Sequence, residues 1–145
     1  LATPDFVTIN RNNSVSTAGL GAPFRFKGSS NSYKETNGAF SPLNDAHWAN
    51  AVIHSLFFST TGNRPLQAAT RVNVHFGNNL PTAFWDGHAV FLGDGDQMFF
   101  PFTSLDIIAH EVAHGFSEQH SQLSACQCYS TILQGGCAVC SFGCP

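Results

Sequence analysis

Two histidines four residues apart, with a glutamate directly after the first, form the pentapeptide His110-Glu111-Val112-Ala113-His114. On a helix such histidines lie about one turn apart on one face, where two ring nitrogens can bind one Zn²⁺. Glu111 is offset by roughly 100° of helical rotation, which puts its carboxylate beside the metal, where it can take a proton from water. The pattern therefore predicts two zinc ligands and a general base. It leaves the third protein ligand of a catalytic zinc site unassigned.

A helix is expected around this pentapeptide on independent grounds. Thr103 or Ser104 can cap its start, and Asp106 lies in the first turn, where the helix dipole favours an anion. Over residues 105–120, apolar and polar side chains separate onto two sides at the helical period. The apolar arc consists of Leu105, Ile108, Ala109, Val112 and Phe116. We expect this arc to pack on a core while the histidines face a site.

Other periodicities predict the elements that must position this helix. Short strands are expected within residues 5–26, and a second helix over residues 44–59. The apolar stripe of that helix would consist of Trp48, Val52, Ile53, Leu56 and Phe57. Residues 71–77 alternate as in a half-buried strand, with Val72, Val74 and Phe76 on one face and Arg71, Asn73 and His75 on the other. Another strand is expected over residues 83–92, followed by a turn into the zinc helix.

Composition and charge narrow the class of protein. The chain has 145 residues, of which 43% are hydrophobic and 10% charged, which is enough for one core. It has no apolar run that could span a bilayer and no signal peptide, and it begins without Met, as a mature chain or a fragment would. All 6 Lys and Arg lie between Arg11 and Arg71, so the acidic second half should attract cations and repel a phosphate backbone. Neither membrane nor nucleic-acid binding is expected.

A series of short motifs adds a family resemblance. They are Asn37-Gly38-Ala39-Phe40-Ser41-Pro42-Leu43-Asn44-Asp45-Ala46-His47, Phe84-Trp85-Asp86-Gly87, Gly93-Asp94-Gly95, Phe99 through Pro101, Ser104-Leu105-Asp106, and the pentapeptide followed by Gly115-Phe116. In this order and spacing, over about residues 24–123, they resemble the thermolysin family of secreted zinc endopeptidases. Within that family they are most similar to the elastase and vibriolysin branch.

The resemblance implies roles for individual residues. His110 and His114 match the two zinc histidines, and Glu111 matches the general base. The strand that pairs with the substrate backbone matches Thr82, Ala83, Phe84 and Trp85. Thr82 stands where the family usually has Asn, a departure that affects one expected substrate hydrogen bond. A secreted, extracellular location and a polypeptide substrate follow from the same likeness.

Three further positions carry over from the family. Phe99 and Ile107 match residues that line the pocket for a bulky apolar side chain on the leaving-group side of the substrate. Asp106 matches a calcium ligand, so both Zn²⁺ and Ca²⁺ are implied as cofactors.

The resemblance stops after about Leu123. In the family the third zinc ligand is a Glu within an Asn-Glu pair, at the position of Gln134 here. Residues 124–145 contain no Asp, Glu, Lys or Arg and hold all five cysteines, Cys126, Cys128, Cys137, Cys140 and Cys144. They can form a cysteine module that binds metal, form disulfides with one thiol left over, or be out-of-frame or spliced sequence. We favour the last, because likeness and composition change at one point.

His120 is a second candidate for the third zinc ligand. It lies six residues after His114, the interval of another zinc protease class, the metzincins, but Ser117 stands where that class needs Gly to turn the chain back. Glu118 would lie roughly 9 Å along the helix axis from a metal between the histidines. A Glu side chain reaches that distance poorly.

We therefore predict an α+β fold. Residues 1–123 would form the β-rich N-terminal lobe of a thermolysin-like fold ending in the central zinc helix, without the helical second lobe, followed by a cysteine-rich tail. By lineage the chain is a zinc metalloendopeptidase, expected to be weak or inactive alone. In the family the second lobe supplies part of the cover of the apolar arc, so exposed apolar surface and self-association are expected. The alternative is a non-catalytic metal-binding or structural module that uses the His pair and the cysteines.

Overall fold

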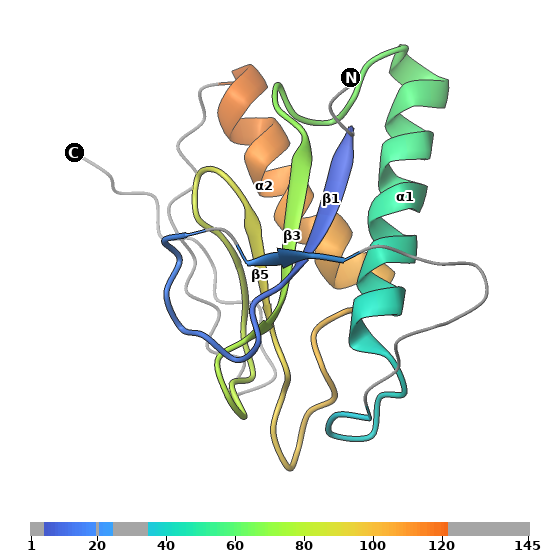
Figure 1. Ribbon diagram of the computed structural model, residues 1–145. Coiled ribbons are helices and arrows are strands. Elements are labelled where there is room, and N and C mark those ends of the chain that lie inside the picture. Colours follow the sequence, from blue (N-terminus) through green and yellow to red (C-terminus); the bar gives the residue numbers. More distant parts are fainter. Residues whose placement is uncertain (1–4, 20, 25–34, 122–145) are drawn as a thin grey trace, which may run out of the picture.

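The computed structural model describes residues 5–19, 21–24 and 35–121 (Figure 1). Its elements are β1 (Phe6–Asn10), β2 (Ala22–Pro23), α1 (Pro42–Thr61), β3 (Thr70–Phe76), β4 (Ala83–Trp85), β5 (Val90–Gly93) and α2 (Leu105–Ser121). The strands form one sheet in the order β2-β1-β3-β5-β4. β1, β3 and β5 are parallel to one another, whereas β2 and β4 pair antiparallel at the two edges. The predicted α+β class is confirmed, and the tail from residue 124 onward lies outside the described residues.

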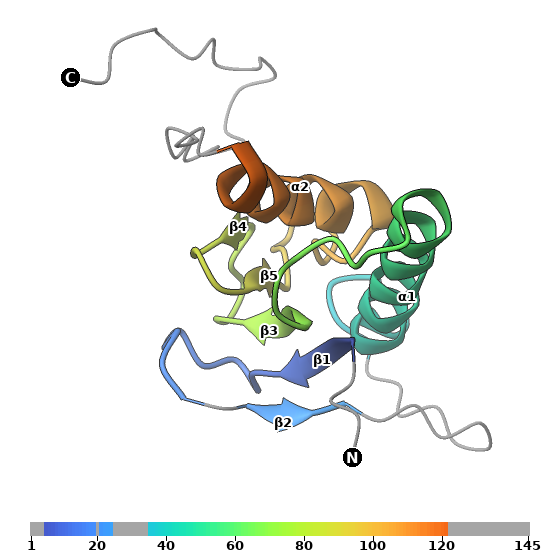
Figure 2. The same cartoon turned by 90° about the horizontal axis from the view of Figure 1, so that it is seen from above.

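Both helices cover one face of this sheet (Figure 2). α1 packs on β1 and β3, α2 packs on β4 and β5, and the two helices pack on each other. The core between them is built from fully buried β-branched and aliphatic side chains, including Val72, Val74, Val90, Leu92, Ile108 and Val112. The zinc helix is therefore fixed by contacts within this chain. Neither α1 nor α2 is long and apolar enough to cross a membrane.

A smaller aromatic cluster lies on the other face of the sheet. Phe91 is stacked on Phe84 at 5.2 Å and meets Phe76 edge-on at the same distance. The Arg11 guanidinium lies over the Phe91 ring, 5.9 Å from its centroid, and donates hydrogen bonds to the carbonyls of Ser16, Ala18 and Gly19. The loop after β1 thus covers this second face.

The expected half-buried strand at residues 71–77 is wrong in two respects. Only Arg71 is exposed in β3, because the sheet is covered on both faces. Phe76 does not share the face of Val72 and Val74. His75 has a left-handed φ of 58°, and the register to β5 shifts between Val74 and Phe76. This bulge turns the Phe76 ring to the aromatic cluster.

The helix predicted over residues 44–59 is α1, but its predicted apolar stripe is partly wrong. Ile53 is buried, whereas Trp48 and Leu56 are 61% and 59% exposed. The face against the sheet instead carries Ala46, Ala49 and Asn50. These small side chains let the helix backbone approach the strands closely, which leaves the bulky residues outside.

The zinc helix predicted over residues 105–120 is α2. Its apolar arc is covered by the sheet and α1 rather than left open. Ile108 and Val112 are fully buried, and Phe116 contacts Phe57 at 5.3 Å between ring centroids. The expectation that the arc lacks part of its cover therefore holds mainly for Leu105, which is 37% exposed, while Ala109 and Phe116 are partly buried.

Candidate active site

The side chains of His110 and His114 converge on one point beside α2. Their Nε2 atoms are 3.0 Å apart, and their rings are nearly perpendicular, with centroids 4.6 Å apart. Two nitrogens bound to one tetrahedral zinc at 2.0–2.1 Å would be about 3.3 Å apart. The observed pair therefore fits two ligand positions of one zinc ion without a change of helix geometry.

Glu111 is placed next to this pair but in a drier environment. Its side chain is largely buried, with the residue 7% exposed. Burial is the main influence and raises the pKa of the Glu111 carboxyl above its usual value, while His114, His110 and a hydrogen bond from the Trp85 backbone lower the pKa. A carboxylate with a raised pKa is a stronger base. The sequence pattern thus yields the histidine pair and the base in one place.

A pocket of about 450 Å³ opens beside these residues. It is lined by Thr82, Ala83, Phe102, Asp106, Ile107, His110 and Glu111. Thr82 directly precedes the edge strand β4 and Ala83 begins it, so the sheet edge and the zinc helix form two walls. Phe102 was missed by the sequence reasoning, because an apolar residue after Pro101 gives no sign of whether it faces the core or a pocket.

Three other residues of the predicted substrate site do not line this pocket. Phe84 belongs to the aromatic cluster on the far face of the sheet. Trp85 points along α2, where its Nε1 donates a 2.7 Å hydrogen bond to Glu118. Phe99 packs against the lining residue Phe102, with 6.2 Å between the ring centroids, but does not line the pocket itself.

Trp85 also explains the glycine that follows His114. A Cβ on Gly115 would lie 2.8 Å from Cζ2 of Trp85 and 3.0 Å from a methyl carbon of Leu66. Glycine at this position lets the zinc helix lie directly on the indole of β4. Because Glu118 accepts the Trp85 hydrogen bond, its carboxylate is occupied away from the histidines.

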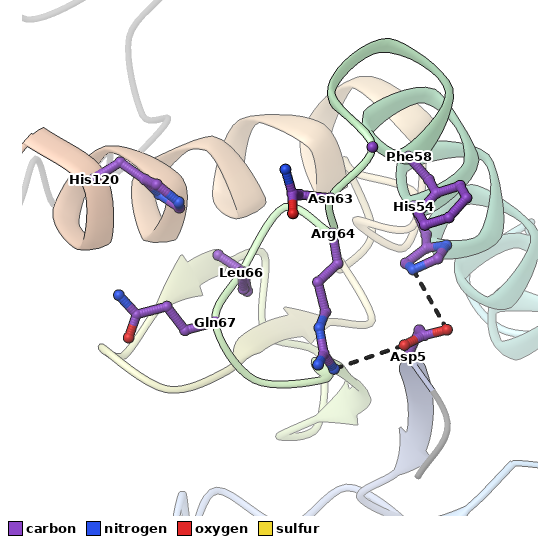
Figure 3. A pocket seen from close by; sticks show the side chains of 9 residues that line it. Asp5, His54, Phe58, Asn63, Arg64, Leu66, Gln67 and His120 are labelled. Carbon is purple, nitrogen blue, oxygen red and sulfur yellow. Dashed lines mark ion pairs between the residues drawn. The ribbon is translucent and has the colours of Figure 1, made fainter. Parts of the chain in front are cut away.

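His120 lies apart from the histidine pair. Its Nδ1 donates to the Phe116 carbonyl at 2.9 Å, and its ring stacks on Phe116 at 4.2 Å. It lines a different pocket, of about 460 Å³. In the lining of that pocket an Asp5 carboxylate oxygen lies 3.8 Å from His54 Nε2, and the other lies 3.7 Å from Arg64 Nη1 (Figure 3). Within the described part of the chain, no three His, Cys, Asp or Glu side chains are grouped to hold a metal.

Asp106 is exposed on the rim of the candidate active-site pocket. A hydrogen bond from Ser104 is the main cause that lowers the pKa of its carboxyl, with backbone amides of the helix start acting in the same direction. The charged form is thus favoured at the N-terminus of α2, as the helix dipole predicts. Its role as a calcium ligand stays a prediction.

Comparison with known proteins agrees with this geometry. The catalytic-domain profile of the thermolysin metallopeptidases matches residues 3–118, and the chain therefore belongs to the thermolysin metallopeptidase family. The fold is also similar to the precursor of protealysin, a metalloproteinase from Serratia proteamaculans, with a TM-score of 0.63 and 26% identity. That match covers 77% of this chain and 34% of the other.

The relatives by sequence are bacterial proteases. The hemagglutinin/proteinase of Vibrio cholerae is 46% identical over 93 residues, which cover 64% of this chain and 15% of the relative. The neutral protease of Vibrio proteolyticus is 44% identical, with the same coverage. A zinc metalloproteinase of Legionella pneumophila is 42% identical over 103 residues, covering 66% of this chain and 19% of the relative. The chain spans less than a fifth of the length of these curated relatives.

Proposed function

We propose that this chain is the zinc-helix part of a metalloendopeptidase that hydrolyses peptide bonds with Glu111 as the general base. The observation that carries the proposal is the burial of Glu111 beside two imidazole Nε2 atoms 3.0 Å apart. Membership of a metallopeptidase family supports the same conclusion.

The roles of the residues follow from their positions. His110 and His114 hold the zinc ion, and the third ligand comes from outside the described residues. When bound, zinc supplies a Lewis acid that polarises the scissile carbonyl and lowers the pKa of water. Glu111 accepts the proton of the attacking water and returns it to the leaving amine.

The substrate is a polypeptide that lies along the free edge of β4. β4 pairs only with β5 in the described sheet, so its outward backbone groups can bind an extended chain. A bulky apolar side chain on the leaving-group side enters the pocket between Ala83, Phe102 and Ile107, with Phe99 behind Phe102. We also propose that Asp106 binds calcium. The protein is secreted. A second lobe or a second copy of the chain contacts the exposed apolar residues.

The expected substrate preference can be measured in a spliced enzyme, in which residues 1–123 are joined to the C-terminal remainder of the Vibrio cholerae hemagglutinin/proteinase. Peptides with Leu or Phe after the scissile bond should be cleaved about 10 to 100-fold faster in kcat/KM than the same peptide with Gly, because a buried Leu gains about 1.5–3 kcal/mol. The variant Phe102→Ala should reduce this ratio, whereas Phe100→Ala, at an exposed position, should not. Equal cleavage of all three peptides would contradict the assignment of the pocket.

A further inference from the structure

The carboxyl ends of the three parallel strands meet at one edge of the sheet, and four polar side chains from separate segments gather there. They are Asn13 after β1, Asn37 before α1, His75 at the end of β3 and Asp94 after β5. We call this group the latch. None of its members belongs to the candidate active site, and none has been given a role above.

Asp94 is the centre of the latch. Its Oδ1 accepts a 2.6 Å hydrogen bond from His75 Nδ1, and its Oδ2 accepts one of 3.0 Å from Asn13 Nδ2. Its backbone carbonyl accepts a third, of 2.8 Å, from Asn37. Asn13 also donates to the Gly77 carbonyl at 2.7 Å. The side chains of His75 and Asp94 are only 2% and 4% exposed, so the hydrogen bond between these two side chains is made away from water.

The latch holds conformations that cost free energy. Asn13, Asn37 and His75 have φ angles of 65°, 45° and 58°, in the left-handed region that few residues other than Gly adopt. Asn tolerates this region at little cost, so the strain lies mainly at His75. His75 Nε2 is buried and has no hydrogen-bond partner among the described residues, a further cost. Strain of this kind persists only where the surrounding structure holds the residue in place, and it is often found near functional sites.

The backbone next to Asp94 is hydrogen-bonded to two walls of the candidate active-site pocket. Gly93, directly before Asp94, donates its N–H to the Thr82 carbonyl at 2.8 Å, and its own carbonyl accepts from the Phe102 N–H at 3.1 Å. Thr82 and Phe102 both line the pocket. The chain packs closely against Gly93, because a Cβ there would collide with the Leu80 carbonyl oxygen. One peptide segment thus supports two walls, and the latch fixes that segment.

We propose that His75 and Asp94 are positioning residues, which set the distance between the edge strand and the Phe102 wall through the backbone of Gly93. The importance for catalysis rests on the proposed function. The mechanical link from His75 to Thr82 and Phe102 does not, and it can be measured on the chain without any activity.

The test is amide hydrogen exchange, followed by NMR, in three variants of the chain. His75→Phe removes the donor, and His75→Asn keeps an N–H donor and tolerates the left-handed φ. Ile53→Val, in the core under α1, serves as a matched control for general loss of stability. We expect His75→Phe to speed exchange of the Gly93 and Phe102 amides at least 10-fold more than that of α1 amides. His75→Asn should restore most of the protection, and Ile53→Val should show no such selectivity.

Other outcomes would overturn the proposal. A uniform increase of exchange in His75→Phe, equal to that of Ile53→Val, would make the latch a merely stabilising feature. If His75→Phe does not fold, Asn37→Gly removes one hydrogen bond at an exposed position that already has a left-handed φ, and it should give the same selective exchange on a smaller scale. In the spliced enzyme His75→Phe should raise KM more than it lowers kcat, because the histidines and Glu111 stay in place. If the spliced enzyme is inactive, the proposed function fails, while the exchange result still decides the latch.

Discussion

Replacement of Glu111 by Gln is expected to slow peptide hydrolysis by the spliced enzyme about 10² to 10⁴-fold, the usual contribution of a general base. Gln has the shape of Glu but cannot accept the proton of water. Glu111 is not one of the two nitrogen ligands, so zinc should be retained at unchanged stoichiometry. The measurement is kcat/KM on an apolar peptide together with the zinc content of each purified protein.

The matched control for this variant is Glu118→Gln. Glu118 lies two turns along the same helix and accepts a hydrogen bond from Trp85, which the Gln oxygen can also accept. Its rate should stay within a few-fold of the parent. A Glu111→Gln enzyme that keeps its activity, or a Glu118→Gln enzyme that loses as much, would contradict the assignment of the base.

The double variant His110→Ala/His114→Ala is expected to lose specific zinc binding. Partners that merely orient a ligand contribute about 10 to 100-fold to metal affinity, so loss of both direct ligands should weaken binding by more than 100-fold. This is measured by zinc titration of the chain with its cysteines intact. His120→Ala, at the exposed end of the same helix, should leave affinity unchanged.

The same titration separates the protease reading from the alternative of a cysteine-based metal module. If the double variant binds zinc as tightly as the parent, the five cysteines outside the described residues are the ligands. The histidine pair would then be an ordinary solvated pair, and the proposed function would lose its main support.

The zinc helix was predictable because the same helical spacing places both its site residues and its core residues. Ile108 and Val112 face the core, while the histidines and Glu111 lie toward the pocket, so a single 3.6-residue pattern gives both. The edge position of residues 83–85 followed from family likeness. The α+β class followed from elements long enough to show their own periodicity.

Contacts between distant segments were not predictable in the same way. Alternation in β3 gives the wrong face for Phe76, because a bulge at His75 interrupts it. The His75 side chain is hydrogen-bonded to the Asp94 carboxylate, nineteen residues later. The expectation that the acidic second half attracts cations stays a prediction, but the separate surroundings of its carboxylates were not predictable. Asp94 is buried, whereas Asp86 and Asp96 accept backbone hydrogen bonds of their own turns.

The edge strand shows the same limit within a few residues. Thr82 and Ala83 line the pocket, but Phe84 turns to the far face and Trp85 to α2. Side chains on a strand point alternately to the two faces of the sheet, and the pairing of β4 with β5 decides which residues point to which face. No local signal in the sequence fixes that register, so the likeness to a substrate-binding strand assigned all four residues together.

The most direct test of the central claim is NMR of the imidazole nitrogens of the uniformly ¹⁵N-labelled chain during zinc titration. The sequence contains 7 histidines, of which only His110 and His114 should lose the free Nε2 signal at one equivalent of zinc. The signals of His120 and of the buried His75 should not change. Binding of one zinc equivalent that shifts no imidazole signal, or that shifts His120 in place of the pair, would contradict the account.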